Sequence, residues 1–559
     1  RLMQGAWHGH GRWTGGGYYL REETVIDFQR ESWTYLELVR RRADEYGDRL
    51  FTTFSNGQTL TFSEFETATS DMASALANLG VEPGDRVAAM IFNCKEFLLA
   101  MLATHKRGAI FVPINTELKG AFLEHQISNI DPKVVFVSDE LRPAFDTIAI
   151  DSLSIETTVS IEGHGAPLPD TTGVPFTQLL ATQARDGDLI PPTPHDICMI
   201  MFTSGTTGPS KGTLMPHAHC LLFGYGSGRA LEMTPDDKMF ICMPFFHAMG
   251  LLLQLTSCLM YGSSAHVIRR FSATTWLDEI RQSEATLTYG LGVIPEFIFR
   301  QPETPHDRDH HLRLMLAVPI GEEWGEAFEQ RFGLRLVQAY GMTECNIPAY
   351  GKPEDPLMVG CAGHLEEDFF EVRVVDPDTD EEVPCGETGE IVVRPKQPAC
   401  FMAGYYKMPE RTVEAWRNMW FHTGDAGRFD KEGRLFFIDR IKDCIRRRGE
   451  NISAFEVEQV INNHPDVAES CVIGVRDEDA GGEEEVKACV VPTGNAPEFT
   501  SILDWCVERM PRYAVPRYIE YVGELDKTPT GKLRKQDLRD AGITQDTWDR
   551  ESIGYVVPR

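Results

Sequence analysis

A short apolar segment that runs directly into a loop of glycine, hydroxyl and lysine side chains is the most restrictive feature of this sequence. Residues 197–202 read Ile-Cys-Met-Ile-Met-Phe, the pattern of a buried strand. Residues 203–212 then read Thr-Ser-Gly-Thr-Thr-Gly-Pro-Ser-Lys-Gly, with three glycines, five hydroxyl side chains and one lysine. The backbone N–H groups of such a loop can surround phosphate oxygens, and the lysine adds a mobile positive charge. The segment predicts a nucleotide triphosphate site at the end of a strand.

This loop is not a P-loop, which places two glycines five positions apart, followed by Lys and then Ser or Thr. Here Ser210 precedes Lys211 and Gly212 follows it. A flexible surface turn is the alternative, but flexible linkers rarely place several hydroxyls and a lysine behind a buried strand. A second glycine cluster, Gly224–Gly228, does not complete a dinucleotide fingerprint, and we interpret it as local packing or a turn.

Helix and strand signals alternate from residue 59 onward. Residues 62–79 have helical apolar spacing that stops at Gly80, and buried strands are predicted at 86–92, 111–114 and 134–137. Such alternation favours an α/β fold whose parallel sheets are covered by helices on both faces. Short alternating strands after residue 370 predict a β-rich subdomain.

The chain of 559 residues is too long for one hydrophobic core. A small α+β segment begins after a charged stretch, Asp439–Asp443, of the kind an exposed hinge would have. We therefore expect a large N-terminal domain over residues 1–440 and a small mobile C-terminal domain over residues 441–559.

Composition excludes several classes of protein. The formal net charge of −30 argues against binding nucleic acid or an anionic membrane. The thirteen cysteines include no C-x-x-C pair, which argues against zinc ribbons and disulfide frameworks and favours a reducing, cytoplasmic compartment. The most apolar run, Gly250–Met260, is too short to span a bilayer, and no basic-then-apolar signal segment is seen, so we expect no membrane insertion.

Five separated segments, taken together, resemble the signatures of the adenylate-forming superfamily, which includes acyl-CoA synthetases, peptide-synthetase adenylation domains and luciferases. In chain order they are the loop at 203–212, Tyr340-Gly-Met-Thr-Glu344, Thr423-Gly-Asp425, Asp439-Arg-Ile-Lys442 with Gly449-Glu-Asn-Ile-Ser453, and Thr528-Pro-Thr-Gly-Lys532. The resemblance covers about residues 30–545. Phe437–Arg440 and Thr547–Arg550 are most similar to the crotonobetaine/carnitine–CoA ligase branch.

The resemblance implies carboxylate activation. A carboxylate oxygen attacks the α-phosphorus of ATP to give an acyl-adenylate and pyrophosphate, and a thiol, usually that of coenzyme A, then displaces AMP. The attacking carboxylate is already ionised, so the first step depends on alignment and charge neutralisation rather than on a general base. ATP, Mg²⁺ and coenzyme A are the implied cofactors, and a small carboxylic acid is the implied substrate.

The resemblance assigns roles to individual residues. Phosphate contacts are implied for Thr203, Ser204, Gly205, Thr206, Thr207 and Lys211. Tyr340 would lie against adenine and Thr343 would contact the α-phosphate, while Glu344 would help to hold Mg²⁺, which needs only one or two carboxylates. Asp425 would bind the ribose hydroxyls with Arg440 nearby, although a turn cap is the alternative for Asp425 considered alone.

The remaining assignments concern the acyl group and the thiol. Lys532 would bridge the carboxylate and the α-phosphate, and Lys442 would be the hinge on which the small domain rotates. Pro244-Phe-Phe-His247 resembles an aromatic gate, with a buried structural histidine as the alternative for His247. Two interpretations stay open, the acyl pocket or ordinary core packing, for Val293–Pro295, Gln338, Ala339 and Met342. Arg446–Arg448 are either a solvated face or a site for CoA phosphates, with Gly449 admitting the pantetheine arm.

This sequence departs from the usual motifs at three places. Pro209-Ser210 precedes the loop lysine, where many relatives have proline directly before it. Arg448-Gly449 replaces a common Gly-Gly, and Ala317–Ile320 stands where a glycine-containing segment often precedes the Tyr340 motif. The resemblance therefore predicts the residues of the thiol tunnel and the adenine contacts less closely than those of the phosphate site.

We expect an ATP-dependent carboxylate–CoA ligase. An adenylating enzyme that passes the acyl group to a carrier protein or an amine shares the first half-reaction and is the main alternative. A catalytically silent nucleotide-binding protein is a second alternative, against which Lys532, Glu344 and Asp425 count. A homodimer, common among members of the superfamily, is left open, as is the identity of the acid.

Overall fold

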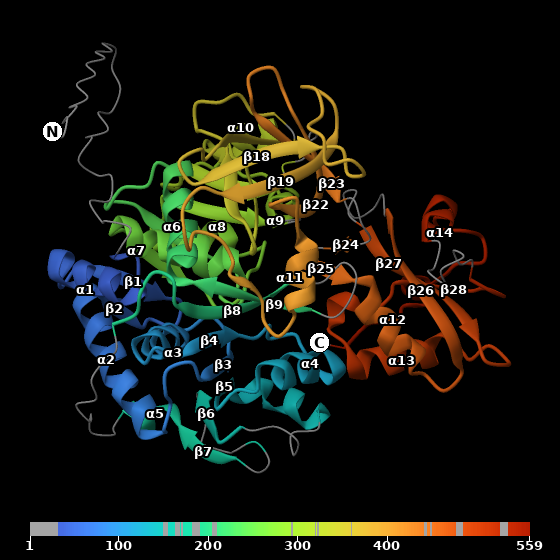
Figure 1. Ribbon diagram of the computed structural model, residues 1–559, viewed down its shortest axis with the longest axis horizontal. Coiled ribbons are helices and arrows are strands. Elements are labelled where there is room, and N and C mark those ends of the chain that lie inside the picture. The colour runs from blue at the N-terminus through green and yellow to red at the C-terminus, as the bar shows by residue number, and fades with distance from the viewer. Residues whose placement is uncertain are drawn as a thin grey trace.

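The computed structural model describes most of the chain, namely residues 32–148, 155–161, 168, 171–180, 191–203, 210–291, 294–318, 320, 324–358, 360–440, 444–447, 450–476, 484–525 and 535–558. Three sheets lie in the part before residue 441, and the residues after 444 form a smaller lobe beside them (Figure 1). The predicted α/β class, with a β-rich portion and a small α+β portion after it, is confirmed. The boundary predicted near residue 440 stays a prediction.

The strand before the glycine-rich loop belongs to an eight-stranded sheet. In spatial order its strands are β20 (Gly404–Tyr405), β9 (Lys211–Pro216), β8 (Ile197–Thr203), β4 (Ile110–Pro113), β3 (Arg86–Met90), β5 (Val134–Ser138), β6 (Thr157–Ile161) and β7 (Thr172–Pro175). From β8 to β7 the strands are parallel, whereas β9 and β20 continue the sheet antiparallel. All five residues of β5 are buried, as a strand covered on both faces requires.

A second sheet is parallel apart from one hairpin. Its order is β14 (Arg335–Val337), β13 (Leu314–Val318), β12 (Leu287–Leu291), β10 (Lys238–Ile241), β11 (Ser264–Val267), β1 (Leu50–Phe54) and β2 (Thr59–Thr61), with only β1 and β2 antiparallel. The third sheet is antiparallel throughout, as predicted for the β-rich portion. Its order is β15 (Ala339–Met342), β16 (Asn346–Tyr350), β17 (Cys361–Leu365), β23 (Leu435–Arg440), β22 (Trp420–Phe429), β19 (Gly389–Pro395) and β18 (Phe370–Val375), with β21 (Trp416–Arg417) on β22.

Helices cover these sheets and carry the connections between strands. They are α1 (Tyr35–Tyr46), α2 (Phe62–Asn78), α3 (Lys95–Lys106), α4 (Gly120–Ile130), η3 (Asp139–Thr147), α5 (Phe176–Leu180), α6 (His217–Ala230), η5 (Met249–Leu255), α7 (Thr256–Tyr261), α8 (Trp276–Ser283), α9 (Ile294–Phe299), α10 (Gly325–Phe332) and α11 (Pro409–Ala415). The start of α2 is fixed by a reciprocal capping box between Thr61 and Glu64. No helix in the described ranges is both long enough and apolar enough to cross a bilayer.

The glycine cluster at 224–228 lies inside α6 rather than in a turn. A Cβ atom on Gly224 would come within 2.8 Å of the Thr256 backbone, and one on Gly228 would come within 2.0 Å of the Tyr261 ring. These glycines let α6 pack closely on α7, which outweighs their low helix propensity. Packing, one of the two alternatives, is therefore correct, and the turn is wrong.

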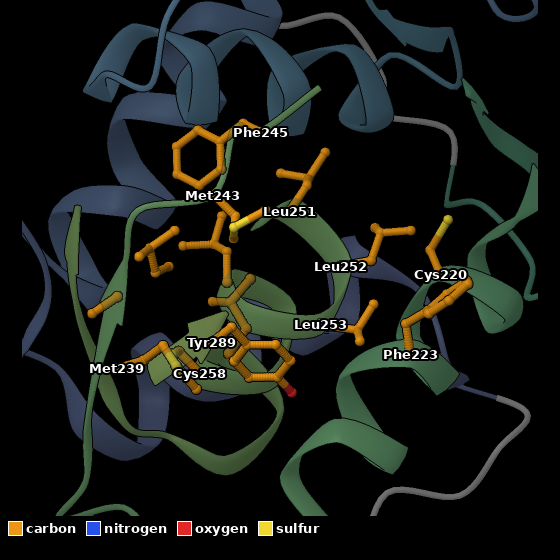
Figure 2. Packing of buried hydrophobic residues seen from close by; sticks show 14 of the residues in the cluster. Cys220, Phe223, Met239, Met243, Phe245, Leu251, Leu252, Leu253, Cys258 and Tyr289 are labelled. Carbon is orange, nitrogen blue, oxygen red and sulfur yellow. The ribbon is translucent and has the colours of Figure 1, made fainter. Parts of the chain in front are cut away.

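The core beside α6 is built largely from η5, a π-helical segment that continues into α7. Figure 2 shows Leu251–Leu253 of η5 with Phe223 of α6 and Tyr289 of β12. Leu253 and Tyr289 both bond Ser227: its hydroxyl donates to the Leu253 carbonyl at 2.6 Å, and it shares a hydrogen bond with the Tyr289 hydroxyl. Ser227 of α6 thus links η5, the helix after the predicted gate, to β12.

The smaller lobe has its own hydrophobic core, drawn from residues between Ile445 and Val557. Its elements are β24 (Cys444–Arg447), β25 (Glu450–Ser453), α12 (Ala454–Asn462), β26 (Val467–Arg476), β27 (Glu484–Pro492), α13 (Phe499–Arg509), η7 (Arg512–Ala514), β28 (Tyr518–Tyr521), α14 (Lys535–Ala541), β29 (Trp548–Asp549) and η8 (Arg550–Ile553). It packs on α4 through α13 (Figure 1). A Cβ on Gly120, whose φ is 55°, would lie 2.8 Å from the Arg509 backbone.

Candidate nucleotide site

The described ends of the glycine-rich loop lie opposite each other in the first sheet, where β8 ends and β9 begins. Thr203 ends β8, Lys211 begins β9, and the two residues pair across the strands. Ser210 is held by α4, because its carbonyl accepts a hydrogen bond from His125 Nε2 at 2.9 Å. The intervening residues lie outside the described ranges, so the phosphate contacts predicted for Ser204, Gly205, Thr206 and Thr207 stay predictions.

A buried carboxylate lies beside these loop ends. Glu344 is only 4% exposed, and its Oε1 accepts hydrogen bonds from Thr203 Oγ1 at 3.2 Å and from the Tyr405 hydroxyl at 3.1 Å. Lys211 Nζ lies 4.3 Å from the centre of the Tyr405 ring. Burial, followed by the charge of Glu344, raises the pKa of Tyr405, so its hydroxyl stays protonated and donates. Three distant segments of the chain therefore meet at Glu344.

Tyr405 is a site residue that the sequence interpretation missed. It reaches the site because β20 pairs with β9, which sets Tyr405 opposite Thr213. A two-residue strand far along the chain carries no local signal for that pairing. The only clue in the sequence is that the segment is apolar and aromatic.

Tyr340 and Asp425, predicted for adenine and ribose, contact each other. The Tyr340 hydroxyl donates to Asp425 Oδ2 at 2.8 Å, and both residues are buried. The Tyr340 ring is stacked on Phe437, with ring centres 5.9 Å apart. Burial and then the Asp425 charge raise the pKa of Tyr340 well above its ordinary value, so the phenol remains a donor. Arg440 lies directly across from Asp425 in the pairing of β22 and β23.

The loop between β15 and β16 carries Thr343 and Glu344. It is tied to the first turn of α6 by His219, whose Nε2 lies 2.8 Å from the Thr343 carbonyl. Asn346 contacts the same histidine from the far side of the loop. Neither His219 nor Asn346 was singled out in the sequence, because a buried histidine in a helix carries no signal of its own.

The predicted aromatic gate follows β10. His247 is half-buried, and its ring lies 4.6 Å from that of Phe246. Asn93, at the end of the neighbouring sheet, braces this segment: Phe245 N donates to Asn93 Oδ1 at 2.8 Å, and Asn93 Nδ2 donates to the Met243 carbonyl at 2.9 Å. The gate segment is thus anchored between the two parallel sheets.

The residues expected near the acyl group differ in burial and in their contacts within the fold. Gln338 Nε2 donates to the Met358 carbonyl at 2.6 Å, so a ligand contact from this nitrogen would replace a bond within the fold. Ala339 is buried and Met342 half-buried on β15. Val293 lies outside the described residues, and Pro295 packs under Gly290.

Part of the predicted thiol and hinge machinery lies outside the described ranges, namely Lys442, Arg448, Gly449 and Lys532. Within the basic run, Arg447 is described and is 3% exposed. Its Nε lies 2.6 Å from Glu485 Oε2, and its Nη1 donates to the Tyr513 carbonyl at 2.7 Å. Arg447 therefore forms a buried ion pair with Glu485 inside the small lobe. Both alternatives stated for the run, a solvated face and a phosphate site, are wrong for this residue.

Comparison with known families decides the assignment. Residues 39–406 match the profile of the AMP-binding enzymes, and residues 456–532 match the AMP-binding enzyme C-terminal domain. The chain belongs to the AMP-binding enzyme family. Crotonobetaine/carnitine–CoA ligase of Salmonella typhimurium is 31% identical over 509 residues, which cover 89% of this chain and 97% of that protein.

Solved structures of three further enzymes show the same fold. The o-succinylbenzoate CoA synthetase of Bacillus subtilis has a TM-score of 0.78 at 25% identity, covering 92% of this chain and 99% of that one. ATP-bound MatB of Rhodopseudomonas palustris has a TM-score of 0.65 at 27% identity, covering 90% and 98%. The amide bond synthetase McbA of Marinactinospora thermotolerans scores 0.74 at 25% identity, covering 90% and 99%. The predicted family, the AMP-forming acid–thiol ligase class and the resemblance to the carnitine branch are confirmed.

The candidate nucleotide site offers a position that fits Mg²⁺. In the described part of the chain, no group of three or more His, Cys, Asp or Glu side chains could hold a metal ion unaided. Magnesium bound with a nucleotide needs less, since substrate phosphates and waters supply most of its oxygen ligands. Glu344 is a buried carboxylate whose hydroxyl donors, among the described residues, both fall on Oε1. Its other oxygen suits a cation at the loop ends.

Proposed function

We propose that this ligase activates a small carboxylic acid with ATP and Mg²⁺ and then transfers the acyl group to coenzyme A. The observation that carries the proposal is that Thr203 and Tyr405 both donate to the buried carboxylate of Glu344, while Lys211 lies against the Tyr405 ring. That arrangement puts a cation, a carboxylate and hydroxyls where the two ends of a phosphate loop meet. Bound Mg²⁺ would neutralise charge on the phosphate oxygens.

Adenylation requires alignment of two anions. The substrate carboxylate attacks the α-phosphorus, a new C–O–P linkage forms, and the bond to pyrophosphate breaks. Lys211 and the loop hold the β- and γ-phosphates, Thr343 contacts the α-phosphate, and Asp425 with Arg440 binds the ribose. Lys532 neutralises charge between the carboxylate and the α-phosphate, and His247 borders both. Near neutral pH the acid is ionised, so no protein group removes a proton in this step.

Thioester formation needs a different arrangement at the same centre. The sulfur of coenzyme A, as thiolate, attacks the acyl carbon, the bond from that carbon to the AMP oxygen breaks, and AMP leaves. Lys532 must withdraw to admit the pantetheine arm. We propose that residues 441–559 rotate about Lys442 between the two half-reactions, with Arg448 and Gly449 lining the thiol approach.

The acceptor and the acid are tested together. Purified enzyme is first assayed for ATP–pyrophosphate exchange against acids that include crotonobetaine, carnitine, o-succinylbenzoate and anthranilate. Acids that support exchange are then incubated with ATP and, separately, with coenzyme A, a carrier protein or a panel of amines. Thioester formation with coenzyme A supports the proposal, whereas amide formation would favour an activity like that named for McbA. Failure of every acid to support exchange would revive the silent nucleotide-binding alternative.

We also propose a cytoplasmic location. Twelve of the thirteen cysteines are free thiols, and ten of those twelve are buried, as a reducing compartment allows. Quantifying reactive thiols in the native and unfolded enzyme, isolated without reductant, checks this: thirteen titratable thiols after unfolding are expected, and fewer would indicate disulfides.

A further inference from the structure

A fully buried histidine joins the segment that follows the phosphate loop to the loop that carries Thr343 and Glu344. His219 lies in the first turn of α6, which begins directly after β9 and hence shortly after Lys211. Its side chain is 0% exposed. Its Nε2 lies 2.8 Å from the Thr343 carbonyl, one residue before Glu344.

The hydrogen-bond partners fix which ring nitrogen carries the proton. A carbonyl oxygen can only accept, so Nε2 must donate to Thr343. On the other side, Asn346 Nδ2 lies 3.2 Å from His219 Nδ1 and also donates to the His219 carbonyl at 2.9 Å. The amide cannot be turned round, because its Oδ1 accepts from Ile347 N at 3.0 Å. Nδ1 is therefore the acceptor, and the imidazole is neutral.

The surroundings keep this arrangement rigid. Phe223 and Phe401 pack against the His219 ring, with ring centres 5.1 Å and 6.3 Å away. Asn346 is also 0% exposed and adopts a left-handed φ of 69°, a conformation that asparagine tolerates better than most residues. Burial lowers the pKa of His219 to about 4 and outweighs the Thr343 and Cys400 carbonyls, which raise it, so the imidazole is neutral.

We propose that His219 is a positioning residue: locked as its Nε2–H tautomer between Asn346 and the Thr343 carbonyl, it holds Glu344 in register with the phosphate loop. The inference rests on the proposed function. Magnesium-bound ATP contacts both the loop and Glu344, so a small relative displacement of the two segments weakens cation binding and misaligns the α-phosphate. Mg²⁺-dependent ATP binding should therefore depend on His219.

His217 supplies a matched control on the same helix. It is 2% exposed, burial likewise lowers its pKa to about 4, and it faces Tyr35, whose backbone N–H donates to its Nδ1 at 3.3 Å. Removing either imidazole should destabilise the fold. Only removal of the His219 imidazole should change the Mg²⁺ dependence of ATP binding.

The test compares His219→Leu with His217→Leu by equilibrium ATP binding at a series of Mg²⁺ concentrations, alongside thermal unfolding. We expect His219→Leu to raise the Mg²⁺ concentration for half-maximal ATP binding at least fivefold, and His217→Leu to leave it within twofold. His219→Gln, whose amide nitrogen can replace Nε2, should restore most of the loss, whereas the shorter side chain of His219→Asn should not.

Equal Mg²⁺ midpoints for His219→Leu and His217→Leu would overturn the proposal and leave His219 a structural residue. If the leucine variants do not fold, the Gln and Asn variants decide, and an Asn variant that binds as well as the Gln variant would overturn it. The binding assay does not require turnover. Failure of the wild-type enzyme to exchange pyrophosphate with any acid would therefore contradict the proposed function without deciding the role of His219.

Discussion

Tyr405 shows how strongly the site depends on one side chain contributed from a distant segment. Its hydroxyl donates to Glu344, and its ring lies against Lys211. Tyr405→Phe removes the hydrogen bond and keeps the ring, so catalytic efficiency with MgATP should fall by roughly tenfold, the worth of about 1.5 kcal/mol for a bond to a charged group. Tyr405→Leu should lower catalytic efficiency further, because the cation–π contact between Lys211 and the ring is also lost. Pyrophosphate-exchange rates measured over a range of MgATP concentrations check both, and a Phe variant equal to wild type would contradict this view.

Lys532 should act in only one half-reaction. Its role is electrostatic, so Lys532→Ala should slow adenylation by about a hundred- to thousandfold, the usual cost of one contact that stabilises developing charge. Conversion of a synthetic acyl-adenylate to thioester should change far less. Lys535→Ala is the control, because Lys535 forms an ion pair with Glu458 at 2.7 Å within the small lobe. Stopped-flow measurement gives the rate of each half-reaction separately. Equal slowing of both half-reactions by Lys532→Ala would refute a role for Lys532 in adenylation alone.

Helix α4 contacts both the phosphate loop and the small lobe. His125 holds the Ser210 carbonyl, and Gly120 lies against the Arg509 backbone. Gly120→Ala should push the lobe out of this arrangement, because its Cβ would meet backbone that cannot rotate away. Gly84→Ala is the matched control, since Gly84 also has a positive φ but has open space around it. Small-angle scattering should show an altered lobe arrangement for Gly120→Ala alone, and identical profiles would count against the contact.

Several strands of the first parallel sheet and helix α2 could be predicted from sequence, because buried strands and amphipathic helices carry their signal locally. The helix expected over 62–79 is α2, and the strand expected at 197–202 is β8. The partners of site residues could not be predicted, because they depend on pairings between distant strands. Asp425 and Arg440 were predicted from the family resemblance, yet the contact of Asp425 with Tyr340 depends on how the third sheet pairs. Neither alternative stated for Arg447, a solvated face or a site for CoA phosphates, included its ion pair, because its partner Glu485 lies on another strand.

The molecule as a whole combines a strongly acidic surface with neutral histidines buried in the larger part. His105 and His217 are fully enclosed, and their rings lie 5.5 Å apart. Burial lowers the pKa of His217 to about 4 and that of His105 well below its ordinary value. Both pKa values are therefore lower in the folded state than near 6.5 in the unfolded chain. The unfolded state binds more protons below pH 6.5, so stability is complete above that pH and is lost as the pH falls toward 4.

For His217 this loss amounts to about 3 kcal/mol between pH 6.5 and pH 4. The net charge of −30 also shrinks on acidification, which relieves repulsion and acts in the opposite direction. A variant that keeps the surface charge isolates the histidine contribution. His105→Phe retains an aromatic ring beside Tyr35 and removes one buried titrating group. The midpoint of acid unfolding, followed by tryptophan fluorescence, should move to lower pH in this variant. A midpoint unchanged or moved to higher pH would show that the buried histidines do not set the acid limit of the fold.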